Sequence, residues 1–227
     1  MSAGTTIASI LLLCALVAAG AGLWLKQQQI LQREAFQALA ARRGWSLTLS
    51  EQKLGRPAIL RMTARSGRGW HCESRLSPGP DHGMPDYLTT EFIAQDPHWP
   101  DGNLVLTPGE KMGADISVVA LTKGKSQLSI QDRVDLALPN AISAQLRDFA
   151  APQDLKVQAT LDPTHRFDLD VLATVLTEWQ MQQANTDGQP LIHIGPEGFR
   201  VQVNYGMRRA EQMESFIDFA LNLIRVI

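Results

Sequence analysis

The chain has 227 residues, of which 44% are apolar, and its 21 basic and 23 acidic side chains give a formal net charge of −2. A chain of this length and apolar content can bury one sizeable core, which excludes disorder as its default state. The near balance of charge, with no concentrated basic face, argues against a nucleic-acid binder.

An uncharged apolar segment of nineteen residues extends from Ile7 to Leu25. As a helix it would be about 28 Å long, close to the ~30 Å of a hydrocarbon core. Nine of its side chains are Leu, Ile or Val, which favour insertion by about 3 to 5 kcal/mol in total. Trp24 stands at the far end, where an indole suits the headgroup region. We therefore predict a transmembrane helix over residues 7–25, after a short tail of residues 1–6.

Two alternative interpretations of this segment are weaker. Ala19 and Ala21 make a small-x-small pattern that could mark a cleaved signal peptide. Residues 1–6, however, lack the Lys or Arg that such a peptide carries ahead of its apolar region. Cys14 follows three leucines rather than a small residue, which argues against lipoprotein processing.

Basic residues follow the apolar segment and none precedes it. Lys26, Arg33, Arg42 and Arg43 lie within about twenty residues of its end, so the positive-inside rule places the following domain in the cytoplasm. We therefore predict a single-pass protein of the cell inner membrane, with its N-terminus outside and its C-terminal domain cytoplasmic. Cys72 is the one cysteine beyond the segment, which agrees with a reducing compartment.

The helix is expected to continue beyond the bilayer as a stalk over residues 26–44. Neither proline nor glycine interrupts the chain from Leu23 to Arg43, and Gly44 is a typical helix stop. One narrow apolar stripe with helical spacing follows the stalk and consists of Leu31, Ala35, Ala38 and Leu39. We expect this stripe to pack on the chain's own domain rather than on a neighbouring subunit.

Small residues occupy one face of the apolar segment at Ala15, Ala18, Ala19 and Gly22. Their small-xxx-small spacings would let two helix backbones approach closely in lipid. The alternative is that Ala and Gly are simply common in membrane helices. Besides the lipid bilayer, the expected partner is therefore another protein, or a second copy bound through these four residues.

Alternating apolar and polar residues predict strands after Gly44. The predicted strands of this first part cover residues 45–50, 58–65, 70–76, 87–95, 103–107, 116–121 and 128–136. The second and third of them flank Ser66-Gly67-Arg68-Gly69, whose glycines suit a tight hairpin loop. This part of the chain therefore predicts an antiparallel sheet.

Helices become more frequent later in the chain. Helices are predicted near residues 140–150, over 167–184 and from about 208 to the C-terminus. Strands are predicted over 155–161, 191–194 and 199–205, the last two joined around Pro196-Glu197-Gly198. Together these elements predict an α+β fold in which two or three helices pack on a mostly antiparallel sheet. Residues 45–227 would form one soluble domain, or two lobes with a break near residues 122–152.

Two loops, residues 77–87 and 96–102, are the first places to look for a functional site. The densest set of potential metal ligands in the chain lies there and consists of Asp81, His82, Asp86 and His98. Their spacing matches no established metal site. Ordinary solvated turns are therefore the favoured interpretation, and metal binding is the weaker one.

Other titratable residues have structural explanations. His71 and Cys72 are neighbours on a strand and point to opposite faces, so Cys72 is predicted to be a buried structural thiol. Asp168 and Asp170, close to His165, resemble an acid/base pair. Capping of the helix that starts there explains these carboxylates better.

The remaining candidates give no chemistry. His193 stands in a predicted strand without a visible partner. The glycine-rich turns, Lys123-Gly124-Lys125 among them, show neither the Walker nor the GxGxxG spacing. We therefore predict no cofactor.

Two functions remain open at this point. An apolar anchor, a stalk and the lack of a catalytic motif favour a membrane-anchored, non-enzymatic accessory or interaction protein. The alternative is a cytoplasmic-face enzyme, a hydrolase with or without metal assistance that uses the loops over residues 77–102, with Asp81, His82 and His98 as its first candidate groups.

Overall fold

The computed structural model describes residues 3–50, 58–65, 69–75, 89–109, 140–152, 155–182 and 189–227. It describes their side chains except for residues 3–19, 22, 25, 140 and 141. The helices are α1 (Ala3–Arg43), α3 (Asn140–Ser143), α4 (Leu169–Gln182) and α5 (Ala210–Val226). The strands are β1 (Trp45–Ser50), β2 (Ile59–Ala64), β3 (Trp70–Arg75), β4 (Thr90–Ala94), β5 (Leu104–Pro108), β6 (Arg147–Phe149), β7 (Leu155–Ala159), β8 (Leu191–Gly195) and β9 (Gly198–Val203).

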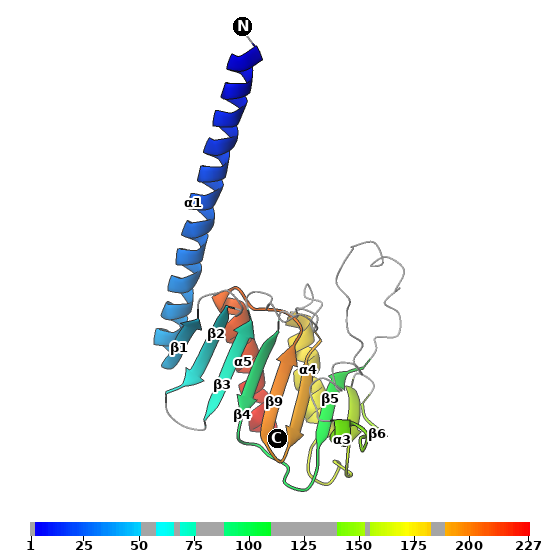
Figure 1. Ribbon diagram of the computed structural model, residues 1–227. Helices are drawn as coiled ribbons and strands as arrows, with labels where there is room; N and C mark the ends of the chain where they lie inside the picture. Colours follow the sequence, from blue (N-terminus) through cyan, green and yellow to red (C-terminus); the bar gives the residue numbers. More distant parts are fainter. Residues whose placement is uncertain are drawn as a thin grey trace.

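The nine strands of the described residues form one sheet in the order β1-β2-β3-β4-β9-β8-β5-β7-β6 (Figure 1). Every neighbouring pair is antiparallel. The pairing of β4 with β9 joins the first four strands to a hairpin from the end of the chain. The predicted α+β fold with a large antiparallel sheet is therefore confirmed. Strands from both sides of residues 122–152 belong to this one sheet.

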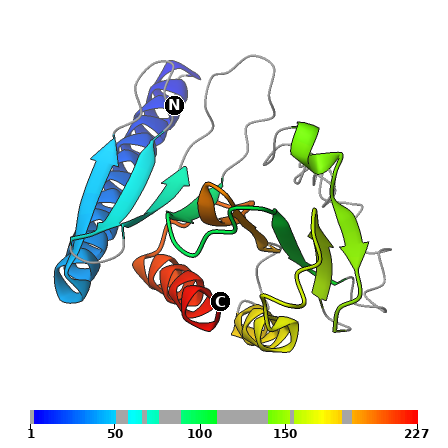
Figure 2. The ribbon, with the colours of Figure 1, turned by 90° about the horizontal axis from the view of Figure 1, so that it is seen from below.

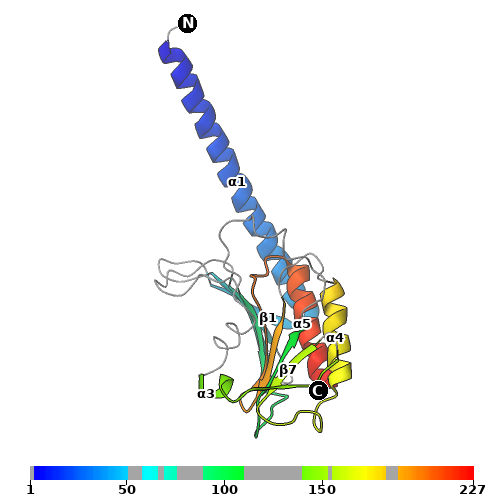
Figure 3. The same cartoon turned by 90° about the vertical axis from the view of Figure 1, so that its right-hand side faces the viewer.

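The two faces of the sheet differ in composition. One face, the covered face, is apolar, and α4, α5 and the end of α1 pack on it (Figure 3). Buried side chains of the covered face include Leu60, Met62, Trp70, Cys72, Phe92, Phe199 and Val201. The other face, the polar face, carries at alternate positions of the same strands Arg61, His71, Glu73, Glu91, His193 and Arg200.

Helix α5 forms the centre of the helical layer. Its Met213, Phe216 and Ile217 are fully buried, as their helical spacing predicts. Seen from below, α4 lies beside α5 on the same side of the sheet (Figure 2). Trp179 of α4 stacks on Phe219 of α5 with ring centroids 4.6 Å apart. The core is therefore made between one sheet face and these helices.

The hairpin predicted around Pro196-Glu197-Gly198 is confirmed as the β8–β9 pair. Gly195 pairs with Gly198, which leaves a two-residue turn between them. Gly198 has φ 117, and a Cβ added there would lie 2.4 Å from the carbonyl oxygen of Ala94. Glycine is required at this position for both reasons.

Helix α1 is continuous to Arg43, and Gly44 with φ 68 ends it as expected. Its first part projects away from the sheet and the other helices (Figure 1). Within the described part of the chain, no helix has both the length and the apolar character needed to cross a membrane. The side chains of residues 7–19, Gly22 and Leu25 lie outside the described ones. The predicted span, and the pairing through Ala15, Ala18, Ala19 and Gly22, therefore stay predictions.

The prediction for the stalk stripe was wrong in three of its four residues. Leu39 is buried, but its buried neighbours are Phe36 and Ala40. Exposed side chains of the predicted stripe are Leu31, Ala35 and Ala38. The stalk offers more than one apolar row at helical spacing, and the domain packs on the row that contains the large Phe36 ring.

The predicted helix near residues 140–150 is confirmed only in its first turn and was wrong for the rest. Helix α3 ends at Ser143, and β6 follows it from Arg147 to Phe149. Each residue of β6 pairs with β7, whose backbone groups would otherwise stand at the edge of the sheet. This pairing outweighs the helical propensity of the segment. The predicted strands 116–121 and 128–136 and the loop 77–87 lie outside the described residues.

Candidate functional site

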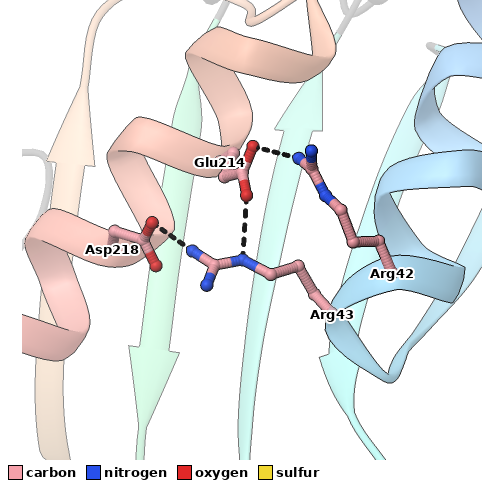
Figure 4. Close-up of polar contacts among 4 residues, drawn as sticks. All are labelled: Arg42, Arg43, Glu214 and Asp218. Carbon is pink, nitrogen blue, oxygen red and sulfur yellow. Dashed lines mark hydrogen bonds and ion pairs between the residues drawn. The ribbon is translucent and has the colours of Figure 1, made fainter.

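The end of α1 is tied to α5 by a cluster of ion pairs, which we call the joint (Figure 4). Arg42 Nη2 lies 2.6 Å from Glu214 Oε2, and Arg43 Nε lies 2.9 Å from Glu214 Oε1. Arg43 Nη2 also pairs with the carboxylate of Asp218. Glu214 and Asp218 are one turn apart on α5, so they present their carboxylates to the same side.

The joint covers an apolar contact. Phe36, Leu39 and Ala40 of α1 are buried in the same core cluster as α5. The Arg43 guanidinium carbon lies 5.2 Å from the ring centroid of Trp45. Trp45 itself contacts the Trp70 ring edge-on at 5.4 Å. Buried packing and ion pairs together fix the direction in which α1 leaves the domain.

The projecting part of α1 exposes large apolar side chains. Leu23 is 71% exposed, Trp24 60%, and Ile30 and Leu31 50% each. The exposure of four such side chains within nine residues is a cost in water, at about 25 cal/mol per Å² of apolar surface. This surface is therefore a candidate for contact with lipid or with another helix.

Three of the four potential metal ligands, Asp81, His82 and Asp86, lie outside the described residues. His98 is exposed, and its Nδ1 lies 3.0 Å from Asp96 Oδ1. Among the described residues no three His, Cys, Asp or Glu side chains come together as a metal site would require. The metal hypothesis thus stays a prediction about the loop of residues 77–87.

Cys72 lies on the covered face, opposite in direction to His71, as expected. Its side chain is fully buried, and Sγ lies 3.4 Å from Sδ of Met213. Burial raises the pKa of this thiol well above its usual range, with a smaller contribution from the charge of Glu91. A thiol held neutral in a core is a poor nucleophile, which agrees with a structural role.

Asp168 caps α4, as predicted. Its Oδ1 accepts a hydrogen bond of 3.1 Å from the backbone N–H of Val171. An open depression of about 670 Å³ is lined by residues 150–152 and 164–170, which include Asp168, Asp170 and His165. These three side chains are exposed, so the depression brings no desolvated acid or base to a substrate.

His193 has a partner that sequence reasoning missed. Its Nε2 lies 3.0 Å from Asn103 Oδ1, a contact between β8 and the residue before β5. Burial, and then the charge of Arg200, lower the pKa of His193 to about 4. Burial also lowers the pKa of His71, with contributions from Arg61 and Arg200. Both imidazoles are therefore neutral at pH 7.

The polar face is held by pairs between strands. Arg200 Nε lies 3.2 Å from Glu91 Oε1, and Arg61 pairs with Glu73. Each pair joins neighbouring strands, β9 with β4 and β2 with β3. Each of these two arginines is paired with a carboxylate, so the pairs bring charges of both signs to the polar face.

The search for similar proteins gives no further guide. Neither a protein family, nor a curated protein, nor a solved structure matches this chain.

Proposed function

We propose that this protein is a membrane-anchored, non-enzymatic accessory or interaction protein that presents an α+β domain on the cytoplasmic side. Residues 7–25 are its single transmembrane helix. The observation that supports this proposal most is the course of α1, which leaves the domain and exposes Leu23 and Trp24 at the end of the apolar segment.

The energetics of the segment favour insertion. Nine Leu, Ile or Val side chains contribute about 3 to 5 kcal/mol, and no charge in residues 7–25 opposes them. Trp24 then lies at the headgroups, and Lys26 follows it on the cytoplasmic side. The bilayer is thus the partner that removes the apolar end of α1 from water.

The joint supports a role in positioning. From Leu25 to Phe36, where α1 begins to pack in the core, a helix rises about 17 Å, so the domain begins at that distance from the span along α1. Arg42 and Arg43 act both as cytoplasmic topology signals and as the contact with Glu214. A rigid spacer of this kind suits a protein that holds a surface at a set height for a partner.

Nothing in the described residues favours the hydrolase alternative over this proposal. The two groups with the largest pKa shifts, buried Cys72 and partly buried His193, lie on opposite faces of the sheet and do not line the depression beside Asp168. The partner that the domain serves is to be found by cross-linking and pull-down from native membranes.

Two arginines in the span test the anchor. Leu13→Arg with Val17→Arg should move the full chain from the alkali-resistant membrane fraction to the soluble fraction. Each arginine costs about 2.5 to 3.5 kcal/mol at the centre of a span, so the two outweigh the 3 to 5 kcal/mol gained by the apolar residues. Ala41→Arg, on the exposed stalk, is the matched control and should stay in the membrane.

Orientation is tested by C-terminal fusions. A reporter that works only after export should be inactive, and a reporter that works only in the cytoplasm should be active. Activity of the exported reporter would overturn the cytoplasmic placement, and a soluble wild-type chain would overturn the anchor.

A further inference from the structure

The exposed part of α1 carries a regular apolar row on one side. Trp24, Leu31 and Ala38 follow one another at intervals of seven residues, and Ala35 stands four residues after Leu31. All four side chains are exposed in the structure. With Gln28, which completes the spacing, we call this row the seam.

The seam lies to one side of the surface of α1 that packs on the domain. At about 100° per residue, its positions stay within roughly 40° of Trp24 around the helix axis. The residues packed on the domain, Phe36, Leu39 and Ala40, are centred about 115° from it. A second helix could therefore lie along the seam without meeting the domain of its own chain.

The spacing is that of a coiled-coil core. Positions 24, 31 and 38 repeat as one core position of a heptad, and 28 and 35 as the other. Gln28 is the one polar core residue between Trp24 and Ala38, and a single buried amide is a device that sets register. Arg42, the next position of the repeat, is bound to Glu214 and ends the seam.

The charges around α1 suit a copy of the same helix. In a symmetric parallel pair each residue faces its own counterpart, so charges in the seam would repel each other. The seam itself is uncharged between positions 24 and 38. Lys26 and Arg33 lie on the far side of the helix, about 160° from Trp24 and Leu31 respectively.

We infer that a second copy of this chain docks in parallel on the seam of α1. The inference rests on the proposed anchoring, because two chains held by identical spans present their seams at the same height and in the same direction. The contact runs about 21 Å from Trp24 to Ala38, and the helix continues from it into residues 7–25. It differs from a pairing through Ala15, Ala18, Ala19 and Gly22, positions that lie about 170° from the seam on the side toward the domain.

Cysteine cross-linking of the full chain in native membranes tests the seam. All variants carry Cys14→Ser, which removes the thiol of the span. The remaining thiol, that of Cys72, is buried. Leu31→Cys and Ile30→Cys form a matched pair, since both side chains are half exposed and adjacent, but Ile30 lies off the seam. Oxidation should give at least fivefold more disulfide dimer with Leu31→Cys than with Ile30→Cys.

A second pair of variants tests the packing itself. Leu31→Gln should reduce self-association in a membrane two-hybrid assay several-fold, whereas Ile30→Gln should leave it unchanged. Equal cross-linking at positions 30 and 31, or loss of association with Ala18→Leu and Gly22→Leu but not with Leu31→Gln, would overturn the seam. A chain that stays in the membrane fraction but does not associate refutes the seam and leaves the anchor intact, whereas a soluble chain refutes both.

Discussion

The two faces of the sheet are built from alternate residues of the same strands, yet different forces hold them. The covered face buries Met62, Cys72 and Phe92 beneath α5, so its stability comes from removal of apolar surface from water. The polar face carries Glu91–Arg200 and Arg61–Glu73 pairs, which are partly exposed. Such pairs contribute little each, about 0 to 1 kcal/mol.

The covered face therefore maintains the fold, whereas the polar face is free to vary with pH and with a partner. A change on the covered face leaves a cavity or an unpaired polar atom, because no water can fill the site. A change at the partly exposed ion pairs of the polar face is buffered by solvent. Equivalent substitutions on the two faces should therefore have unequal effects.

The largest effect is expected for Phe216→Ala on α5. Phe216 is fully buried, and its ring centroid lies 6.3 Å from that of Trp179. Truncation removes most of a phenyl group from a packed core, which should lower the free energy of unfolding by about 3 to 5 kcal/mol. Urea unfolding followed by tryptophan fluorescence measures the loss.

Thr63→Ala on the polar face is the counterpart to Phe216→Ala. Thr63 is only partly buried, so its loss should change the free energy of unfolding by about 0.5 kcal/mol or less. Comparable losses from the two variants would mean that the helical layer does not provide the core.

His193 should make stability depend on pH. Its pKa is about 4 in the folded chain, against roughly 6.5 when unfolded, so the unfolded state binds the proton more readily. The contribution is complete above pH 6.5 and is lost as pH falls from about 6.5 to 4. At 1.36 kcal/mol per pKa unit, the difference of about 2.5 between the two pKa values corresponds to a loss of about 3 kcal/mol.

The matched variant for this prediction is His193→Gln. Its amide can keep a hydrogen bond to Asn103 but has no proton to gain. Denaturant unfolding at pH 7.0, 5.5 and 4.5 should show a shallower fall for His193→Gln than for the wild-type chain. Parallel curves would show that His193 titrates alike in both states.

Much of the covered face could be predicted from local spacing. Alternation in β3 placed Cys72 in the core beside Trp70, and the helical period placed Met213 and Phe216 there. Local spacing could not choose between the two apolar rows of α1, because the choice depends on the domain surface that receives Phe36. Local spacing also missed β6, because Arg147-Asp148-Phe149 shows no alternation of apolar and polar residues. This segment forms a strand by pairing with β7.

The partners of the candidate site residues were harder to predict from the sequence. Arg42 and Arg43 were interpreted as topology charges, which stays a prediction, and their acidic partners on α5 are more than 170 residues away. The partner of His193 is Asn103, 90 residues earlier in the chain. Contacts of this kind follow from strand and helix order, which no local pattern encodes.

A smaller effect than that of Phe216→Ala is expected for Cys72→Ser. A hydroxyl in place of the buried thiol meets Met213 Sδ at 3.4 Å, a weak acceptor, so its desolvation is poorly compensated. The free energy of unfolding should fall by about 1 to 3 kcal/mol. Cys72→Ala, which adds no polar atom, is the control. Loss of function in a stably folded Cys72→Ser chain would instead indicate that Cys72 acts as a nucleophile.

A small effect on stability is expected for Arg200→Gln on the polar face, and its main effect is on the pKa values of two histidines. The Glu91 pair that it breaks is about one-third exposed on both sides, so the free energy of unfolding should fall by about 0.2 to 1 kcal/mol. The charge of Arg200 contributes to the lowered pKa of both His71 and His193, behind burial in each case. Its removal should therefore raise both pKa values only part of the way toward 6.5, since burial remains. Imidazole resonances followed by NMR between pH 3 and 8 measure both values in one titration.

Arg61→Gln is the matched control, because the charge of Arg61 lowers the pKa of His71 and does not contribute for His193. If Arg200→Gln left both histidines unchanged, the polar face would consist of independent residues rather than of a coupled row across the strands.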